Sequence, residues 1–248
     1  MISGKSLAVI PARGGSKRIP RKNVRPFLGK PIISYSIESA LESGLFEEVM
    51  VSTDDEEIAA IGRQCGASVP FMRSEKTADD RSSINDVMKE VLDCYLDSGQ
   101  SFTNVCCILS TAPFASVARL REGYDLLGPA GVEAVIPVVR FSYPIQRAMR
   151  VEPQGDPEGR VSWFFDEYKT CHSQDLEPGF HDAGIFYWFK TEPFLRGGEI
   201  LTARAVAQEI PELEAHDIDS DQDWLIAELK YKLMVASADR ELGRVSHG

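Results

Sequence analysis

Leu7-Ala-Val-Ile-Pro-Ala-Arg-Gly-Gly-Ser-Lys-Arg-Ile-Pro-Arg-Lys-Asn23 joins a short apolar run to a basic loop that contains two glycines. Six cations fall within thirteen residues here, with no acid among them: Arg13, Lys17, Arg18, Arg21, Lys22 and Arg25. The whole chain has a formal net charge of −11, so the remainder carries −17 and the cluster opposes the global charge. Glycines let backbone N–H groups approach an anion, and the cations supply opposite charge. The loop therefore predicts a polyphosphate site, and we expect a nucleoside triphosphate as its ligand.

Strand-like apolar runs alternate with helix-like segments along the first 139 residues. Strands are expected at residues 7–10, 48–52, 67–71, 105–109 and 134–139, and helices at 31–41, 55–65, 83–96 and 117–127. Thr53 or Asp54 is expected to cap the second helix. This alternation implies parallel strands joined by right-handed crossovers, and near-continuous apolar strands fit a sheet covered on both faces. We therefore predict a Rossmann-like, doubly wound α/β fold with a mainly parallel sheet, whose ligands bind at the carboxyl ends of the strands.

The pattern changes between about residues 140 and 180. Prolines and glycines, among them Pro153, Gly155 and Pro157, interrupt any long helix and leave short β-rich pieces at 144–151 and 160–165. The α/β pattern then resumes with an apolar strand at 184–189 and a final helix at 221–233, of which Trp224, Leu225 and Leu229 are expected to face inward. We therefore predict one domain over residues 1–248, with an inserted β-arm at 140–180.

Composition excludes several classes of protein. A pI near 4.9 argues against nucleic-acid binding, which needs a broad basic surface. The five cysteines are odd in number and lack metal-binding spacing, and Cys106 and Cys107 lie inside an apolar run, so we expect reduced thiols in a cytoplasmic protein. No stretch approaches the ~18–20 apolar residues of a membrane span, and no membrane partner is expected.

The basic loop resembles a known signature. Its residues match the pattern Ala-Arg-x-x-Ser-Lys-x-x-Pro-x-Lys-Asn of the CMP-sialate (acylneuraminate) synthetases, cytidylyltransferases that activate nonulosonic acids, at Ala12, Arg13, Ser16, Lys17, Pro20, Lys22 and Asn23. Further resemblances follow in order along the whole chain, at 51–55, at Arg73 with 80–83, at 111–113 and at 217–219. The resemblance implies a nucleotide-diphospho-sugar transferase type of fold. It also implies a homodimer in which the β-arm makes the dimer contact and completes the neighbouring active site.

Asp217 and Asp219 form a second constellation. They lie two residues apart on an extended segment, so both carboxylates point to one face. With triphosphate oxygens and waters they would make a Mg²⁺ site, and Mg²⁺ is the cofactor that we predict. A calcium loop is an alternative, because Asp217, Asp219, Asp221, Asp223 and Glu228 have EF-hand spacing. Gln222 replaces the expected glycine, however, and Pro211 disrupts the entering helix. Asp221 and Asp223 are better explained as helix N-terminal acids beside Ser220.

Four residues are candidates for the sugar site: Gln146, Arg147, His181 and Asp182. Their segments, 143–148 and 181–188, resemble the branch of the family that acts on pseudaminic acid. Where the sialic acid branch has polar residues facing the sugar, this chain has Leu109-Ser110 and Ala183, which fits a less hydroxylated sugar. A structural histidine at 181 and a surface charge at 147 remain alternatives.

The resemblance implies transfer of CMP from CTP to the anomeric hydroxyl of a nonulosonic acid, with release of pyrophosphate. Pseudaminic acid is the expected sugar, with legionaminic or N-acetylneuraminic acid as alternatives. Arg13, Lys17, Lys22 and Asp219 are the expected catalytic residues. The expected nucleotide contacts are Ala12, Arg13, Gly14, Gly15, Ser16, Lys17, Lys22, Asn23, Arg73, Ser82 and Ser83.

A nucleotidyltransferase for hexose 1-phosphates would need a Gly-x-Gly-Thr-Arg type of loop, which is missing. An alternative of another class is a nucleotide-binding protein without catalysis.

Overall fold

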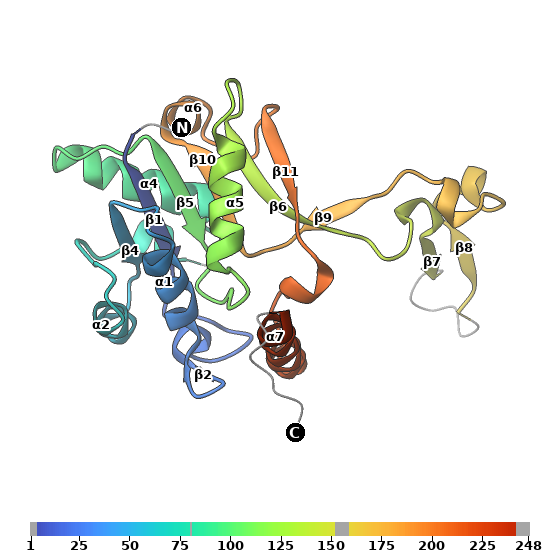
Figure 1. Ribbon diagram of the computed structural model, residues 1–248, viewed down its shortest axis with the longest axis horizontal. Helices are drawn as coiled ribbons and strands as arrows, with labels where there is room; N and C mark the ends of the chain where they lie inside the picture. Colours follow the sequence, from blue (N-terminus) through green and yellow to red (C-terminus); the bar gives the residue numbers. More distant parts are fainter. Residues whose placement is uncertain (1–3, 80, 152–158, 242–248) are drawn as a thin grey trace.

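A seven-stranded mixed sheet runs through the computed structural model, which describes residues 4–79, 81–151 and 159–241 (Figure 1). Six strands follow the order β11-β6-β10-β5-β1-β4, and β9 pairs with β6. Their bounds are β1 Ser6–Pro11, β4 Glu48–Ser52, β5 Asn104–Ile108, β6 Ala134–Arg140, β9 Phe180–Asp182, β10 Phe186–Lys190 and β11 Ala205–Glu209. Only β9 and β10 run antiparallel to the others. The mostly parallel α/β sheet predicted from the sequence is therefore confirmed.

Helices cover both faces of this sheet. The helices are α1 Ile32–Ser43, α2 Glu56–Gln64, α3 Glu75–Ala78, α4 Ile84–Asp97, α5 Val117–Leu127, α6 Thr191–Gly197 and α7 Asp221–Glu241. On β1, Ala8 and Ile10 pack into the core beneath α1, α2, α5 and α7, whereas Leu7 and Val9 pack into the core beneath α4 and α6. Because both faces of β1 are buried, its apolar run is continuous rather than alternating.

Several predicted boundaries needed correction. Residues 67–71 form no strand: Ser68 makes only an isolated bridge to Met50 beside β4, and Pro70 cannot extend the pairing. The cap of α2 is Asp55, whose carboxylate accepts from the N–H groups of Glu57 and Ile58. Strand β11 was not predicted, because its sequence Ala-Val-Ala-Gln-Glu carries little apolar signal.

The inward face of α7 was also predicted incorrectly. Trp224 is buried, but Leu225 and Leu229 are 62% and 61% exposed, and Leu233 one turn later is 57% exposed. Helical spacing brings Trp224 and Tyr231 onto the core side, so the leucines lie on the neighbouring face. The helix therefore carries an apolar stripe that the other described residues leave more than half exposed.

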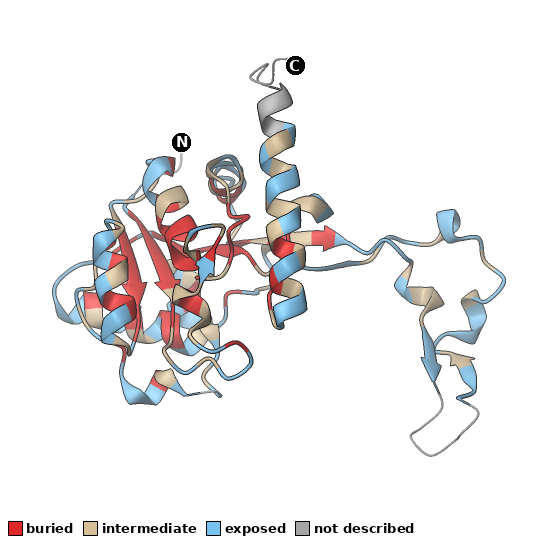
Figure 2. Cartoon of the chain, turned by 90° about the horizontal axis from the view of Figure 1, so that it is seen from below, coloured by how far each residue is buried: buried red, intermediate tan, exposed pale blue. Residues whose placement is uncertain are grey.

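An arm projects from the body of the molecule and is mostly exposed (Figure 2). The antiparallel ladder between β6 and β9 leads into it, and a small hairpin of β7 (Met149–Val151) and β8 (Val161–Trp163) lies at its far end. Short 3-10 turns at Ile145–Arg147, Asp166–Tyr168 and Ser173–Asp175 complete it. The prolines and glycine expected at 153–157 lie outside the described residues. A second small hairpin, of β2 (Pro26–Phe27) and β3 (Lys30–Pro31), precedes α1.

Close packing of α5 on the sheet predicts the effect of Gly123→Ala. A Cβ there would lie 2.9 Å from Trp188 Cδ1 and 3.2 Å from Phe186 Cε2. Trp188 has no room to move, because its indole N–H donates to the Leu120 carbonyl and its ring stacks on Phe46. Overpacking costs about 1–3 kcal/mol and outweighs the better helix propensity of alanine, so we expect a net loss of about 1–2 kcal/mol of unfolding free energy in urea denaturation.

Gly197→Ala in α6 is the matched control. An added Cβ at Gly197 has no described heavy atom within 4 Å beyond its own helix and chain neighbours. The substitution should leave stability unchanged or raise it. Equal effects of the two substitutions would contradict the packing argument.

Candidate active site

The basic loop leaves β1 at the carboxyl edge of the sheet and is fixed there by contacts to the end of β4. The Ala12 N–H donates to the Ser52 carbonyl at 2.9 Å, and the Gly14 N–H donates to Asp54 Oδ1 at 2.9 Å. A Cβ at Gly14 would lie 3.0 Å from Asp55 Cβ. The glycine therefore permits a close approach of the loop to the N-terminus of α2.

A cavity of about 610 Å³ opens beside this loop. The loop supplies one wall, and the segment between residues 73 and 84 and the end of β5 supply the others. The lining residues with polar side chains are Arg13, Ser16, Lys17, Arg18, Lys22, Asn23, Arg73, Thr77, Asp79, Ser82, Ser83, Ser110 and Thr111. We call this space the nucleotide cavity, because five cations, four of them from the basic loop, and a row of hydroxyl groups suit a triphosphate and its sugar.

The six cations of the loop divide into two groups. Arg13, Lys17, Arg18 and Lys22 line the nucleotide cavity. Arg21, in a left-handed conformation at φ 55°, pairs instead with Asp55 and Glu57 at the start of α2. Arg25 pairs with Asp221 and lies over the ring of Trp224. Two of the six therefore tie the loop to neighbouring helices rather than facing an anion.

Hydrogen bonds to the protein orient two polar residues of the cavity. Asn23 donates from Nδ2 to the Arg13 carbonyl at 2.8 Å and accepts from Ser110 Oγ at 2.9 Å. The Arg73 side chain, 8% exposed overall, donates to the carbonyl and the hydroxyl of Ser52. Burial lowers the pKa of Arg73, although nearby Asp54 and Glu90 oppose the effect.

Most residues predicted to bind nucleotide line this cavity. Ala12, Gly14 and Gly15 do not, because the loop turns their backbone toward β4 and α2 or toward solvent. Sequence reasoning missed Arg18, Thr77, Asp79, Ser110 and Thr111 as lining residues. Arg18 belonged to the cation cluster. Thr111 is the first residue of the segment 111–113 noted for its resemblance, and Ser110 precedes it. Thr77 and Asp79 carried no local signal.

Asp219 faces the cations of the loop. Its carboxylate pairs with Arg18 and lies 3.8 Å from the Nζ of Lys22. Burial lowers the pKa of Lys22, and the charges of Asp217 and Asp219 oppose that shift. Ile218 between them is buried, so the two carboxylates share the outer side of the segment. Their hard oxygen atoms fit Mg²⁺, but two carboxylates need phosphate oxygens to complete its shell.

The calcium-loop alternative does not hold. Helix α7 begins at Asp221, in the middle of the proposed loop. The carboxylate of Asp223 accepts from Ser220 and from the Asp219 N–H and thereby caps this helix. Among the described residues, no group of three or more His, Cys, Asp or Glu side chains could hold a metal ion.

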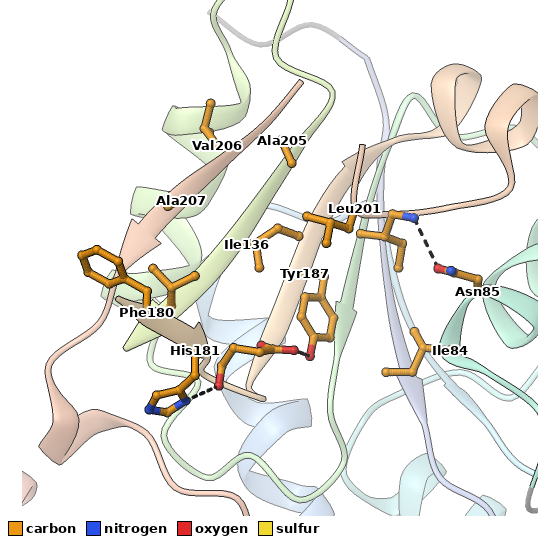
Figure 3. Close-up of a pocket in the computed structure, with 13 residues that line it drawn as sticks. Ile84, Asn85, Ile136, Phe180, His181, Tyr187, Leu201, Ala205, Val206 and Ala207 are labelled. Atoms are coloured by element: carbon orange, nitrogen blue, oxygen red, sulfur yellow. Dashed lines mark hydrogen bonds between the residues drawn. The ribbon is translucent and has the colours of Figure 1, made fainter. Parts of the chain in front are cut away.

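A second, mainly apolar cavity of about 530 Å³ adjoins the first, and Ile84 at the start of α4 lines both (Figure 3). Its aliphatic lining includes Ile136, Leu201, Val206 and Ala207. We call it the apolar cavity. His181, Asp182 and Tyr187 make a polar wall on one side, and Asn85 is a further polar residue of the lining.

The polar wall is held together by hydrogen bonds. Tyr187 Oη donates to Asp182 Oδ2 at 2.6 Å, and the Gly184 N–H donates to Asp182 Oδ1 at 2.9 Å. Burial, followed by the bond to Asp182, raises the pKa of Tyr187 well above its usual value, and the charge of Asp217 adds to the shift. Asp217 thus acts electrostatically on Lys22 in one cavity and on Tyr187 in the other. Neither Asp217 nor Asp219 lines a cavity itself.

Two predicted sugar residues, Gln146 and Arg147, lie in the arm and line neither cavity of their own chain. Gln146 Nε2 donates to the Glu177 carbonyl, and Arg147 donates to Ser173 Oγ and lies over Trp163. Ala183, expected to face the sugar, is buried in the core. Leu109 and Ser110 line the nucleotide cavity.

Comparison with known proteins agrees with this geometry. A family model described as Cytidylyltransferase matches residues 7–123. A pseudaminic acid cytidylyltransferase of Campylobacter jejuni is 40% identical over 236 residues, which are 94% of this chain and 99% of that protein. The chain belongs to the cytidylyltransferase family.

A further relative and a solved structure are also similar to this chain. A CMP-N,N'-diacetyllegionaminic acid synthase of Legionella pneumophila is 37% identical over 150 residues, 60% of this chain and 64% of that protein. The solved structure of a CMP:2-keto-3-deoxy-manno-octonic acid synthetase complexed with CTP has the same fold, with a TM-score of 0.65 at 17% identity, over 94% of this chain and 99% of that one. No helix among the described residues is long and apolar enough to cross a membrane.

The two glycines of the loop should respond differently to alanine. The added methyl group of Gly14→Ala would collide with Asp55, which is held by its cap bonds and by Arg21. Relief by moving the loop displaces the neighbouring cations. We expect Gly14→Ala to weaken nucleoside triphosphate binding by about tenfold in calorimetric titration, equivalent to about 1.4 kcal/mol.

Gly15→Ala is the control, because a Cβ at Gly15 meets no described heavy atom within 4 Å apart from its chain neighbours. Binding should stay within about twofold of the unsubstituted protein. Comparable losses from both substitutions would show that the close approach at Gly14 is not what the site requires.

Proposed function

We propose that this cytidylyltransferase transfers CMP from CTP to the anomeric hydroxyl of a nonulosonic acid and releases pyrophosphate, with pseudaminic acid as its sugar. The observation that carries the proposal is the pair of adjoining cavities, with Asp219 facing Arg18 and Lys22 of the first. One cavity presents five cations to a triphosphate, and the other presents aliphatic side chains beside a polar wall. The 40% identity to a pseudaminic acid cytidylyltransferase over nearly the whole chain supports the same reaction.

The residues of the nucleotide cavity would bind and orient CTP. Arg13, Lys17 and Lys22 would contact the β- and γ-phosphates, while Asn23, Arg73 and Ser83 would contact the ribose or the base. Asp217 and Asp219 would hold Mg²⁺, which when bound supplies charge neutralisation at the α-phosphate and the leaving pyrophosphate. Positioning and charge stabilisation are the main sources of catalysis in such transfers.

A less hydroxylated sugar suits the apolar cavity. Aliphatic residues such as Ile136 and Leu201 offer no partner to a buried hydroxyl group, and an unpaired hydroxyl loses its hydration without compensation. His181 and Asp182 would contact the polar side of the sugar. These features favour pseudaminic acid over N-acetylneuraminic acid, and the legionaminic acid relative makes that sugar the second candidate.

The test is pyrophosphate release from CTP and Mg²⁺ with pseudaminic, legionaminic and N-acetylneuraminic acids. We expect the highest kcat/KM with pseudaminic acid and a value at least about tenfold lower with N-acetylneuraminic acid, because its additional hydroxyl groups would meet the aliphatic wall. CTP binding without pyrophosphate release from any of the three would instead support a non-catalytic nucleotide-binding protein.

Substitution of the acid pair sharpens this test. Asp219→Asn keeps the shape of the side chain but removes the charge that faces Arg18 and Lys22, and we expect kcat to fall by about 100-fold or more. Asp221→Asn is the control, since its side chain is 81% exposed and pairs with Arg25 outside the nucleotide cavity. Full turnover by Asp219→Asn would contradict the assignment of Asp219 as a metal ligand.

We further propose that the chain forms a homodimer, in which each arm completes the partner's active site. The arm exposes large apolar side chains, including Tyr143, Val151, Val161 and Phe164, and α7 exposes its leucine stripe. Exposed apolar surfaces of this kind mark association sites. Arg147 and Gln146, remote from the cavities of their own chain, would then reach those of the partner. With five free cysteines and CTP as a substrate, we place the enzyme in the cytoplasm.

Mixing two inactive variants tests the shared site. Arg147→Ala and Asp219→Ala should each be inactive alone. After unfolding and refolding together, half of the dimers are mixed, and each mixed dimer holds one site with both native residues, so about a quarter of the activity should return. No recovery, although mixed dimers are present by native mass spectrometry, would show that the arm does not serve the partner's site.

A further inference from the structure

The segment from Arg73 to Ser83 forms one wall of the nucleotide cavity, to which it contributes Arg73, Thr77, Asp79, Ser82 and Ser83. Among its described residues only Arg73 and Thr77 are buried. A wall with so little apolar packing must take its shape from polar contacts. The groups that supply these contacts from outside the cavity therefore determine the position of the wall.

Glu90 on α4 receives the largest set of these contacts. Its Oε1 accepts from the Ser74 N–H at 2.7 Å, and its Oε2 accepts from Ser74 Oγ at 2.9 Å and from Thr77 Oγ1. Ser74 is the N-cap residue of the short helix α3, and Thr77 lies within that helix. One carboxylate on α4 therefore holds this turn in place. Glu90 itself does not line the cavity.

The charge of Glu90 is maintained at this position. Partial burial alone would raise its pKa, but the hydrogen bonds from Thr77 and Ser74 and the nearby charge of Arg73 outweigh burial, and the pKa lies below its usual value. The carboxylate is therefore ionised at neutral pH, and hydrogen bonds to an ionised acceptor are stronger than neutral ones.

The turn that Glu90 holds is linked to the basic loop by a hydrogen bond. Two residues after Thr77, the Asp79 carbonyl accepts from the Arg13 guanidinium at 3.0 Å. The Asp79 carboxylate accepts from the N–H groups of Arg81 and Ser82 and from Ser82 Oγ. A displacement of the turn at Ser74 and Thr77 would therefore move Asp79, and with it both Arg13 and Ser82.

We infer that Glu90 is a positioning residue for the nucleotide: it holds the Arg73–Ser83 wall through Ser74 and Thr77 and thereby sets the affinity for CTP without touching it. The identity of the nucleotide rests on the proposed function. None of the described residues of the Arg73–Ser83 segment lines the apolar cavity, which α4 reaches through Ile84 and Asn85, so the affinity for the sugar acid should not depend on Glu90.

Kinetics of three variants test the inference. Glu90→Ala should raise KM for CTP about tenfold, about 1.4 kcal/mol of binding free energy, with kcat and KM for the sugar acid within about twofold. Glu90→Gln should restore most of the affinity, because its carbonyl can accept from the Ser74 N–H while its amide donates to the two hydroxyl oxygens. Asp93→Ala is the control, because Asp93 lies one turn further along α4 and forms an exposed ion pair with Lys89. This substitution should leave kcat and both KM values unchanged.

Hydrogen–deuterium exchange gives a readout that requires no nucleotide. In Glu90→Ala the amides of Ser74, Arg81 and Ser82 should exchange at least about tenfold faster, while those of the β1 core stay unchanged. If Glu90→Ala does not fold, Ser74→Ala should still raise KM for CTP and speed exchange in this segment, by smaller factors. If the unsubstituted protein showed no turnover, the proposed function would be contradicted, but the exchange prediction could still be measured.

Three outcomes would overturn the inference. Unchanged KM for CTP and unchanged exchange in a folded Glu90→Ala protein would remove it. Equal weakening by Glu90→Gln and Glu90→Ala would show that Glu90 acts only as a counter-charge to Arg73. Parallel losses in kcat, both KM values and thermal stability would show a general structural role.

Discussion

The attraction between the cationic loop after β1 and the acids around it is the interaction on which the site depends. Arg21 binds Asp55 and Glu57 at the start of α2, Arg25 binds Asp221 at the start of α7, and Arg18 and Lys22 face Asp219. Like charges crowded into one loop would repel one another, so each needs a carboxylate or a ligand phosphate nearby. Exposed ion pairs contribute little net free energy, and a triphosphate could replace the partner of Arg18 at small cost. The pairs of Arg21 with Asp55 and Glu57 lie outside the cavity and would keep the loop in place during that exchange.

The parts of the fold that were predictable are those determined by local periodicity and by burial on both faces. Leu7 and Val9 pack on one side of β1 and Ala8 and Ile10 on the other, which is why a continuous apolar run correctly indicated a central parallel strand. The predictions failed where tertiary context decides. Residues 67–71 have strand-like composition but only one backbone bridge, whereas the weakly apolar β11 is a strand because β6 offers it a free edge. Leu225 and Leu229 resembled core residues, yet Trp224 and Tyr231 occupy the inward face.

The candidate site shows the same division. The residues of the basic loop and the acid pair could be identified because charge and spacing mark them within short stretches. Thr77, Asp79 and Glu90 could not, because their roles arise from side chains that meet across a loop and a helix and have no distinctive spacing. Gln146 and Arg147 were grouped with His181 by resemblance, but the β6–β9 ladder carries them outward into the arm. In the proposed homodimer, the arm of a second copy would bring these two residues near a cavity.

The separation of the two cavities has a consequence for how specificity is encoded. The nucleotide cavity is lined entirely by residues between Pro11 and Thr111, whereas the apolar cavity, apart from Ile84 and Asn85, is lined by residues from Ile136 onward. Among their lining residues, Ile84 in the first turn of α4 is common to both. Under the proposed function, changes in Ile136, Leu201 or Ala207 would alter the sugar specificity without disturbing the packing of the cationic loop. This arrangement is consistent with relatives that keep one fold and are named for different sugar acids. Under the proposed function, the first half of the chain binds the nucleotide and the second half selects the sugar, while Asp217 and Asp219 of the second half would hold the metal beside the phosphates.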